Sequence, residues 1–412
     1  MKTVAQQLEK FLKVAQPMAP LEVELADAVS CILAEDVRSL VDVPHTNLAA
    51  LDGYAVRADE TFGASAHPVT MPVVDEVFAS STERMAHTVG SCVRIASGAR
   101  MPTGADAVVP LQSTDLGTAT VTIRERVAPG ENMRAQAEDV EAGSVVVQAG
   151  TRISSRHIAL LAAAGRDRVV AHPKPRVVIM SIGDELVEPG NALGTGKIYD
   201  ANSHALATAV TNAGAIAYRV GAVPDDRNTL REALKDQLLR ADVIITTGGL
   251  SFGGGDTVKD VLSPLGSVRF DGLAMNPGRQ LGVGTIGDVD GGDGGHDSVV
   301  IFCLPGNPVS AMVAFEVFVR PSLRKMAGYK HLTPRSIRAR ATRGVMSQVG
   351  SQDYVRAQVY GDPHGGYEFD PVGDVNQLSV SDFSVANGLA IVPAGVETVT
   401  IGDELECMIL NV

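Results

Sequence analysis

The stretch ADVIITTGGLSFGGGDTVKD, residues 241–260, joins an apolar run to a glycine-rich turn and then to a segment with helical spacing. Its five glycines surround one hydroxyl group, Ser251, and one carboxylate, Asp256. A glycine-rich turn that enters a helix exposes backbone N–H groups and the positive end of the helix dipole, and both attract phosphate. The stretch fits neither GxxxxGK[ST] nor GxGxxG, and many glycine-rich turns are purely structural. By itself it suggests a phosphate site without establishing one.

Around this stretch, from residue 173 to about 328, short apolar runs rich in β-branched residues alternate with helical segments. The predicted strands are 177–180, 217–221, 242–246 and 299–303. The predicted helices begin at 202 and at 256 and span 229–239 and 309–325. This alternation predicts a central doubly wound, mostly parallel sheet with crossover helices on both faces. In such a sheet, ligands bind at the carboxyl ends of the strands. Residues 288–297 are expected to form a hairpin tip, because the spacing and terminal Glu of an EF-hand calcium loop are missing.

The rest of the chain predicts further domains around this sheet, so the fold class is multidomain α/β plus β. Segments 1–45 and 141–172 form a split helical domain, with helices at 4–14, around 26–34 and from Ser154 or Ser155. Residues 46–140 are rich in Val, Thr, Gly and Pro and predict a β insertion domain. Residues 173–328 hold the α/β domain. Residues 329–412 alternate with period two and predict a C-terminal β-barrel-like domain.

Composition narrows the class of partner. The 412 residues carry a net charge of −13, no Trp and only 4% aromatic residues, which argues against a nucleic-acid partner. The four cysteines are far apart and form no CxxC pair, so neither a zinc site nor a disulfide framework is indicated. No apolar run approaches the roughly 18 residues of a membrane span. We expect a cytoplasmic protein, not inserted in a membrane, that binds a small molecule or another protein.

Five loops are predicted to meet at one edge of the sheet, and they carry unusual chemistry. They span 181–185, 224–226, 246–260, 276–279 and 305–310. Five acidic side chains in them would repel one another unless a cation lies between them: Asp184, Glu185, Asp225, Asp226 and Asp256. Oxygen-ligated Mg²⁺ is such a cation. Two or three of the five are instead expected to cap helices or to be solvated, and the Pro-Gly-Asn-Pro turn at 305–308 fits either a helix start or a ligand clamp.

Eight motifs, in the right order and spread over nearly the whole chain, resemble the MoeA family of molybdopterin molybdenumtransferases, which includes the E domain of gephyrin. They are LDGYAVR (51–57), RIASGARMPTGADAVV (94–109), AEDV (137–140), SIGDEL (181–186), GKIYDAN (196–202), GGLSFGGGD (248–256), PGR (277–279) and LPGNPVSA (304–311). The resemblance implies an elongated homodimer of four-domain chains. It also implies that molybdenum from molybdate is inserted into adenylated molybdopterin, with release of AMP in a Mg²⁺-dependent step.

The same resemblance implies roles for particular residues. The implied catalytic residues are Asp52, Glu185, Asp225 and Asp256, and the implied metal ligands are Glu185, Asp226 and Asp256. The implied binding residues for the pterin, its phosphates and molybdate are Ser97, Asp184, Gly248, Gly249, Ser251, Gly253, Pro277, Gly278, Arg279, Pro305, Asn307, Ser310, Arg356 and Ser384. Within these sets, Asp52 and Ser97 would reach the cleft from the partner subunit, and Arg356 and Ser384 would bind molybdate.

Three positions depart from the family's usual pattern. Gly254 replaces an acidic residue, Asn276 replaces the first lysine of a KPGKP segment, and Gln377 stands where a serine is expected. A charged contact is typically worth about 1.5–3 kcal/mol, so these changes are expected to weaken the metal and oxyanion sites. The alternative function is a gephyrin-like dimeric scaffold with weak or lost insertase activity. Such a scaffold would bind a short peptide of a membrane-receptor or cytoskeletal protein between the C-terminal domain and the dimer interface.

Overall fold

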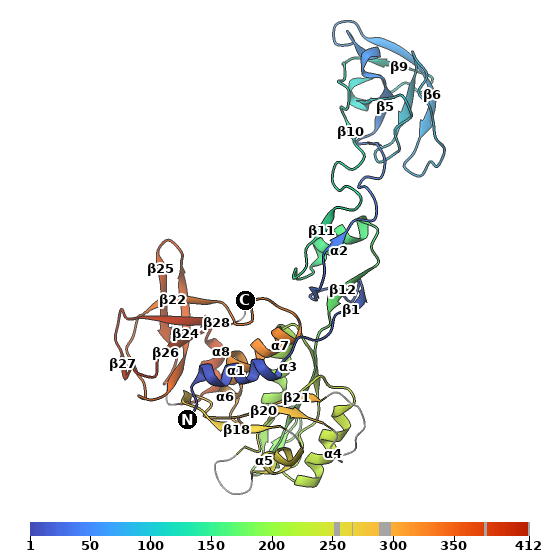
Figure 1. The fold of residues 1–412 in the computed structure, drawn as a ribbon. Coiled ribbons are helices and arrows are strands. Elements are labelled where there is room, and N and C mark those ends of the chain that lie inside the picture. The colour runs from blue at the N-terminus through green and yellow to red at the C-terminus, as the bar shows by residue number, and fades with distance from the viewer. Residues whose placement is uncertain (251–255, 266, 288–297, 375–376, 411–412) are drawn as a thin grey trace. The chain divides into compact units, whose positions relative to one another are not determined.

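The computed structural model describes residues 1–250, 256–265, 267–287, 298–374 and 377–410. Ser251, Gly253, Gly254 and the predicted hairpin tip at 288–297 lie outside them. The chain forms two compact units (Figure 1). Unit 1 comprises Met1–Leu21, Ser30–Ala34 and Ala171–Val412, and unit 2 comprises Glu22–Val29 and Glu35–Val170.

The core of unit 1 is a six-stranded sheet in the order β16–β13–β17–β21–β20–β18. Its strands are β13 (Arg176–Ser181), β16 (Ile216–Arg219), β17 (Val243–Thr247), β18 (Arg269–Gly272), β20 (Gln280–Ile286) and β21 (Val299–Leu304). The first four strands in the sheet order run parallel, and β20 and β18 are antiparallel to their neighbours. The predicted mostly parallel sheet is confirmed.

Helices cover both faces of this sheet, as the apolar runs predict. Ile179, Ile245 and Phe302 belong to one buried cluster. Their sequence neighbours, such as Ile244 and Ile301, belong to the cluster on the opposite face. The first face is covered by α1 (Val4–Val14), α3 (Asn202–Asn212), α6 (Pro308–Ala314), a π-helical segment η4 (Phe315–Val319) and α7 (Arg320–Met326). The second is covered by α4 (Arg227–Leu238) and α5 (Thr257–Leu262), followed by η3 (Ser263–Leu265). Strands buried on both sides are continuous apolar runs in the sequence, which is why the sequence predicts them.

The C-terminal part of unit 1 is a closed five-stranded barrel, which confirms the predicted barrel-like domain. Its strands are β22 (Ser336–Ala341), β24 (Gln352–Asp362), β25 (Gly366–Pro371), β26 (Gly388–Val392) and β28 (Glu404–Ile409). Pairing of β24 with β26 closes the barrel. The short strand β19 (Met275–Asn276) pairs with β24 and so joins the barrel to the loop that precedes β20. Smaller elements are β23 (Val345–Met346), β27 (Thr398–Val399) and α8 (Val380–Val385).

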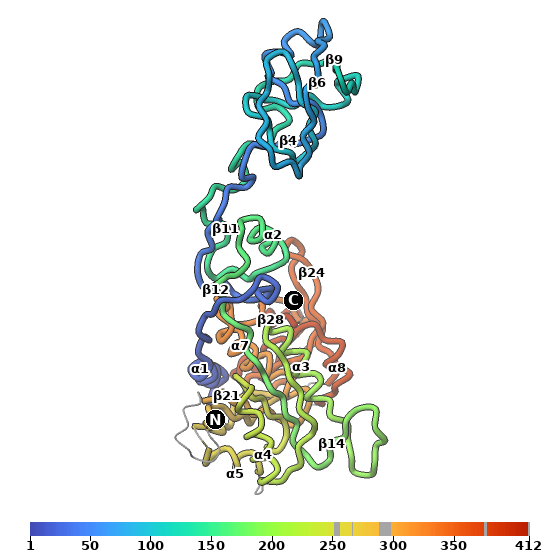
Figure 2. Tube along the Cα trace, turned by 90° about the vertical axis from the view of Figure 1, so that its right-hand side faces the viewer, coloured from blue at the N-terminus to red at the C-terminus, as the bar shows by residue number. Residues whose placement is uncertain are grey.

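A segment with two short parallel strands, β14 (Leu186–Val187) and β15 (Ile198–Tyr199), projects from unit 1 (Figure 2). The helix predicted around 26–34 is wrong. Strand β2 (Ile32–Leu33) lies there instead, and it pairs with Ala171 and His172 of β12 (Arg168–His172). The helical propensity of this stretch is overridden by a pairing partner far away in sequence.

Unit 2 contains a five-stranded sheet in the order β8–β5–β7–β6–β9, which confirms a β-rich insertion. Its strands are β5 (Gly53–Val56), β6 (Val69–Val77), β7 (Cys92–Ile95), β8 (Ala107–Pro110) and β9 (Thr120–Ile123). The other elements of the region are β1 (Leu21–Glu24), β3 (Val37–Arg38), β4 (Leu48–Ala49), β10 (Met133–Arg134), β11 (Val145–Val147), η1 (Ala58–Thr61), η2 (Leu111–Ser113) and α2 (Ser155–Ala163). Helix α2 begins after Ser154, as predicted.

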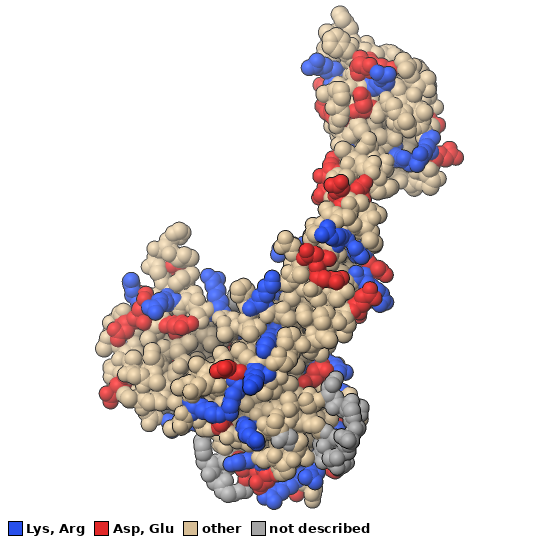
Figure 3. Space-filling view, viewed as in Figure 1, with Lys and Arg blue, Asp and Glu red and all other residues tan. Residues whose placement is uncertain are grey.

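On the face drawn in Figure 3, basic and acidic side chains are interspersed. Within the described ranges, no helix is long and apolar enough to cross a membrane. The predicted domain boundaries at residues 45, 140, 172 and 328 stay predictions.

Candidate functional site

The loops at the carboxyl ends of the parallel strands lie against one another. Ile182, just after β13, forms a parallel bridge with Val223, which follows β16. The backbone N–H of Asp225 donates to a carboxylate oxygen of Asp184 at 3.1 Å. The start of β20 lies at the same edge, since β20 runs antiparallel to β21. The geometry therefore brings together the 181–185, 224–226, 276–279 and 305–310 loops and the start of the glycine-rich turn.

The glycines at the start of that turn are required by the chain's own packing. Gly248 has φ +89°, and a Cβ atom there would lie 2.2 Å from the carbonyl oxygen of Ile182. At Gly249, with φ +63°, a Cβ atom would lie 2.6 Å from a methyl group of Val258. A Cβ atom at Gly306 would lie 3.4 Å from the Cα atom of Gly248. Glycine at positions 248 and 249 lets the loops approach one another closely, whatever ligand they hold, whereas the distance at Gly306 is that of an ordinary van der Waals contact.

A cavity of about 320 Å³ lies at this edge of the sheet, and we call it the edge cavity. It is lined by Ser181, Ile182, Glu185, Leu186, Ile198, Tyr199, Asp200, Ala201, Asn202, Thr247, Gly248, Gly306, Asn307 and Pro308. Three predicted site residues are therefore in its wall: Glu185, Gly248 and Asn307. Asn307 also caps α6, because its side-chain oxygen accepts from the backbone N–H of Ser310 at 3.2 Å.

Asp200 was missed by the sequence reading, although it belongs to the GKIYDAN motif. Its side chain is 1% exposed, and it accepts hydrogen bonds from the hydroxyl of Ser181 at 2.8 Å and that of Ser203 at 2.6 Å. The backbone N–H of Ser203 also donates to it, at 3.0 Å. The buried carboxylate therefore joins the end of β13 to the start of α3 in the wall of the edge cavity. An Asp-x-Asn sequence at the start of a predicted helix was the available signal.

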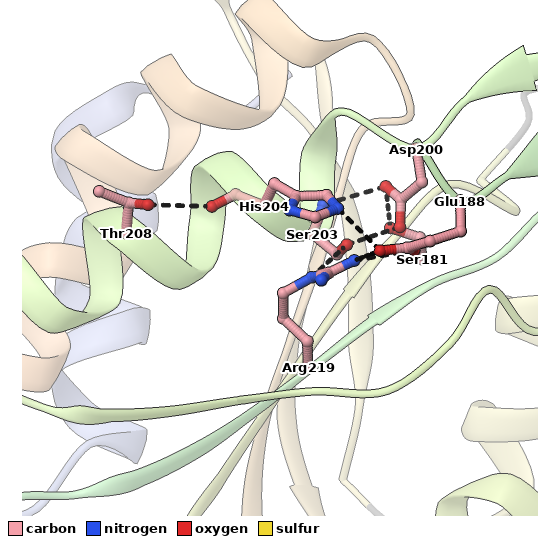
Figure 4. A network of polar contacts seen from close by, with 7 residues as sticks. All are labelled: Ser181, Glu188, Asp200, Ser203, His204, Thr208 and Arg219. Carbon is pink, nitrogen blue, oxygen red and sulfur yellow. Dashed lines mark hydrogen bonds and ion pairs between the residues drawn. The ribbon is translucent and has the colours of Figure 1, made fainter. Parts of the chain in front are cut away.

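A network of hydrogen bonds and ion pairs connects Asp200 through Ser203 to Arg219 and Glu188 (Figure 4). Arg219 donates from Nε to the hydroxyl of Ser203 at 2.9 Å and from Nη2 to both carboxylate oxygens of Glu188 at 2.9 and 3.0 Å. His204 Nε2 lies 3.0 Å from Glu188. The hydrogen bond from Arg219 is the main cause that lowers the pKa of Glu188. This network ties the segment between β14 and α3 to strand β16.

Two of the five predicted acidic residues cap helices, as the sequence suggested. Asp226 accepts from the backbone N–H and the hydroxyl of Thr229, both at 2.8 Å, and these bonds lower the pKa of Asp226. Asp256 is 6% exposed and accepts from the backbone N–H of Lys259 at 3.1 Å, at the start of α5. In the part of the chain that the structure describes, no group of three or more His, Cys, Asp or Glu side chains could hold a metal. The predicted set of metal ligands stays a prediction.

A second cavity, of about 560 Å³, lies where the loop before β20 meets the barrel domain, and we call it the barrel-side cavity. It is lined by Asn276, Arg279, Met346, Ser347, Gln348, Val349, Asp353, Leu378 and Glu397. Arg279 donates from Nη2 to the side-chain oxygen of Gln348 at 2.6 Å. Gly278, next to Pro277, has φ +103°, and a Cβ atom there would lie 3.7 Å from the carbonyl oxygen of Ser310.

Arg356 of β24 is a cation buried in the barrel domain, with 2% of its surface exposed. It donates from Nη2 to the carbonyl oxygens of Asp374 at 2.7 Å and Gln377 at 2.9 Å. Its Nε is buried and has no hydrogen-bond partner among the described residues. Burial lowers the pKa of Arg356, and the nearby charges of Asp382 and Asp374 oppose that shift. Ser384 is exposed in α8, where its hydroxyl donates to the carbonyl of Ser381.

Asp52 and Ser97 lie together in unit 2. The backbone N–H of Ser97 donates to a carboxylate oxygen of Asp52 at 2.7 Å, and its hydroxyl donates to the carbonyl of Ala50 at 3.1 Å. Both side chains belong to exposed residues. Their contribution to a partner's cleft stays a prediction.

Three successive regions of the chain are similar to known protein families. Three family models match: the MoeA N-terminal region (domain I and II) over residues 2–165, a probable molybdopterin binding domain over 178–325, and the MoeA C-terminal region (domain IV) over 338–410. Molybdopterin molybdenumtransferase 1 of Mycobacterium tuberculosis is 35% identical over 430 residues, which cover 100% of this chain and 99% of that protein. The chain belongs to the MoeA family.

Two further proteins of the MoeA family are similar to this chain over most of its length. Molybdopterin molybdenumtransferase of Nostoc sp. is 33% identical over 93% of this chain and 87% of its own length. A solved structure of molybdopterin biosynthesis MoeA protein from Pyrococcus horikoshii is 29% identical, with a TM-score of 0.79 and coverage of 100% and 99% of the two chains. The resemblance inferred from the eight motifs is confirmed, and the edge cavity lies within the region that matches the molybdopterin binding domain.

Proposed function

We propose that the chain acts in molybdenum cofactor biosynthesis as a molybdopterin molybdenumtransferase, which inserts molybdenum from molybdate into adenylated molybdopterin and releases AMP. The observation that carries the proposal is the edge cavity, which lies at the carboxyl ends of parallel strands, where ligands of such sheets bind. The similarity over nearly the whole chain to relatives named molybdopterin molybdenumtransferase supports it.

In this proposal the edge cavity binds one portion of the adenylated pterin, and Arg279 and Arg356 bind oxyanions. Arg279 lines the barrel-side cavity, and a Cβ atom on the neighbouring Gly278 would lie 3.7 Å from the carbonyl oxygen of Ser310. Arg356 offers a buried Nε–H that lacks an acceptor among the described residues. A buried donor without an acceptor is costly, and an oxyanion such as molybdate would satisfy it. Water or a molybdate oxygen attacks the adenylate phosphorus and breaks its bond to the oxygen of the pterin phosphate, while backbone amides and Arg279 hold the anion in line. Attack by water releases AMP directly, and attack by molybdate gives an adenylyl-molybdate that water then splits into AMP and molybdate.

Two carboxylates from the chain are enough for a magnesium site if the substrate completes the coordination. Glu185 lines the edge cavity, and the helix cap uses one oxygen of Asp226. Mg²⁺ in proteins often takes only one or two carboxylates and fills its other positions with phosphate oxygens and water. We propose that Glu185, with Asp226 or Asp256, holds the ion. When bound, it would neutralise charge on the phosphoryl oxygens.

The test is an assay of AMP release and molybdenum cofactor formation by the purified chain, given adenylated molybdopterin and molybdate. We expect both products, and we expect Glu185→Gln to reduce AMP release by at least tenfold in Mg²⁺ while the protein stays folded. Asp167→Asn, on an exposed loop of unit 2, is the matched control. Absence of both products from folded wild-type protein, together with failure to restore molybdoenzymes in an insertase-deficient strain, would overturn the proposal.

We further propose that the chain is a cytoplasmic homodimer in which Asp52 and Ser97 complete the partner's cleft. Light scattering should give twice the mass of the chain. Mixing an Asp52→Ala protein with a Glu185→Gln protein should then restore activity in the hybrid dimers, because one of their two clefts keeps both residues. No recovery in the mixture would count against a shared site.

A scaffold function is the second candidate, favoured by a hollow on the barrel. A cavity of about 210 Å³ there is lined by Arg335, Ile337, Val359, Tyr360, Gly361, Tyr367, Asn387 and Ile409. Tyr360 is 49% exposed, and aromatic side chains of this kind bind short peptides well. We propose that, if insertase activity is weak, the dimer binds a peptide of a membrane-receptor or cytoskeletal protein. A peptide-array screen repeated with Tyr360→Ala tests this, and peptides retained equally by both proteins would contradict it.

A further inference from the structure

Asn202 is a buried amide in the wall of the edge cavity. It is the first residue of α3, and only 9% of its surface is exposed. Its side-chain Nδ2 donates to the carbonyl oxygen of Gly306 at 2.7 Å and to the hydroxyl oxygen of Thr247 at 2.8 Å. The two bonds join the start of α3 to the last residue of β17 and to the turn after β21, so the amide is held between two of the converging segments.

The neighbours fix the orientation of this amide. The carbonyl oxygen of Gly306 can only accept a hydrogen bond. The hydroxyl of Thr247 already donates to the carbonyl oxygen of Pro305 at 2.8 Å, so towards Asn202 it can only accept. The NH₂ group of Asn202 must therefore face these two oxygens, and its Oδ1 must face away from them. Turning the amide over would place Oδ1 against two acceptors.

Oδ1 of Asn202 is left buried without a hydrogen-bond partner among the described residues. Such an acceptor is uncommon, because a buried polar atom that loses water and gains no partner is unfavourable. The hydroxyls of Ser181 and Ser203 cannot serve it, because both donate to Asp200. Asn202 thus brings a buried, unsatisfied acceptor to the wall of the edge cavity.

The rest of the cavity wall indicates what kind of group would approach. Ile182, Leu186 and Ile198 supply apolar surface, and Tyr199 supplies an aromatic ring. The carboxylate of Glu185 is a further acceptor in the same wall. A flat heterocycle fits apolar and aromatic surroundings, and an amino group on its edge would supply the missing donor.

We propose that Oδ1 of Asn202 accepts a hydrogen bond from the exocyclic amino group of the substrate's heterocycle, which makes Asn202 a residue that determines substrate specificity. The inference rests on the proposed function for the substrate class. Adenylated molybdopterin carries such an amino group on its pterin and another on its adenine. The chemistry is the same for both, and the experiment distinguishes them.

The experiment measures binding to the full-length protein with two pairs of probes that differ only in the amino group. One pair is pterin and 4-oxopteridine, and the other is AMP and purine ribonucleoside monophosphate. We expect the wild-type protein to bind the amino compound of one pair about tenfold more tightly, since the analogue leaves Oδ1 unsatisfied. Preference within the first pair identifies the pterin as the donor, and preference within the second identifies the adenine.

Asn202→Leu should abolish that preference, and Asn202→Ser serves the same purpose if the leucine variant does not fold. Asn212→Leu, at the exposed end of the same helix, should keep it. Equal binding within both pairs by the wild-type protein, or a preference that survives the loss of Asn202, would overturn the inference. Binding needs no turnover, so a chain that discriminates without releasing AMP would refute the proposed reaction and leave this inference standing.

Discussion

The ring of Phe11 lies parallel to the ring of Phe302, with the centroids 5.0 Å apart and 5° between the planes. Phe11 belongs to the N-terminal helix α1, and Phe302 lies in the central strand β21. A third ring, Phe318, is 5.1 Å from Phe11. All three side chains are fully buried. The first helix of the chain is therefore part of the core on one face of the central sheet.

Phe11→Ala is expected to lower the free energy of unfolding by about 3–5 kcal/mol, because it removes a buried ring and leaves a cavity between two others. Denaturation in urea, followed by far-ultraviolet circular dichroism, measures the change. Phe62→Ala is the control, since Phe62 is 82% exposed and its loss should change stability by less than about 0.5 kcal/mol. Equal effects of the two variants would show that α1 does not contribute to the core.

Ion pairs also join α1 and the residues just before it to strand β18, and they predict a loss of stability in acid. Asp271 of β18 lies 2.7 Å from the Nζ of Lys2 and 2.8 Å from that of Lys10, and its side chain is 16% exposed. Burial alone would raise the pKa of Asp271, but hydrogen bonds from Lys10 and Lys2 outweigh it and hold that pKa below its usual value.

A depressed folded-state pKa contributes stability above the unfolded pKa of about 4, and that contribution is lost as pH falls through the folded pKa. We therefore expect Asp271→Asn to lower the melting temperature at pH 7 and to differ less from wild type at pH 3. A thermal scan between these pH values checks it, with Asp59→Asn, at an exposed residue of unit 2, as the control. A difference that stays constant with pH would exclude the electrostatic explanation.

The sheet was predictable from the sequence because both of its faces are covered. Strands such as β13 and β17 are continuous apolar runs, and their ends carry the loops that meet at one edge. The failed helix at 26–34 has the opposite cause, since the pairing of Leu33 with Ala171 cannot be read from nearby residues. The individual contacts of the site were equally hidden. The hydrogen bond from Asn202 to Gly306 and the one from Arg279 to Gln348 join residues far apart in the sequence, and no local pattern predicts either of them.

Gly248→Ala is expected to be costly although it adds only a methyl group. The new Cβ would lie 2.2 Å from the carbonyl oxygen of Ile182, and φ of +89° disfavours any L side chain. We expect a loss of about 1–3 kcal/mol in stability and weaker ligand binding in the edge cavity. Gly221→Ala is the matched control, because a Cβ atom there would meet nothing within 4 Å. The argument fails if both variants melt at the same temperature.

Asp226 offers a way to separate helix capping from metal binding. Asn and Asp cap helices about equally well, whereas Ala does not. Asp226→Asn should therefore keep the wild-type melting temperature, and Asp226→Ala should cost about 0.5–2 kcal/mol. If Asp226 also holds Mg²⁺, the Asn variant needs at least tenfold more Mg²⁺ for half-maximal AMP release. An unchanged Mg²⁺ requirement in the Asn variant would reduce the role of Asp226 to the cap of α4.

Asn276→Lys tests whether the departures from the usual MoeA pattern weaken the chain as a transferase. Asn276 lines the barrel-side cavity beside Arg279, so a lysine there would add a second positive charge facing the same space. A charge-assisted hydrogen bond is worth about 1.5–3 kcal/mol, so we expect the molybdate concentration for half-maximal AMP release to fall by about tenfold. Asp353 and Glu397 line the same cavity and would attract the lysine, which sets an upper limit on that gain.

Asn212→Lys adds the same charge at the exposed end of α3 and should leave the molybdate requirement unchanged. Should both lysine variants shift the requirement equally, the effect would come from net charge, and Asn276 would have no specific place in the oxyanion site.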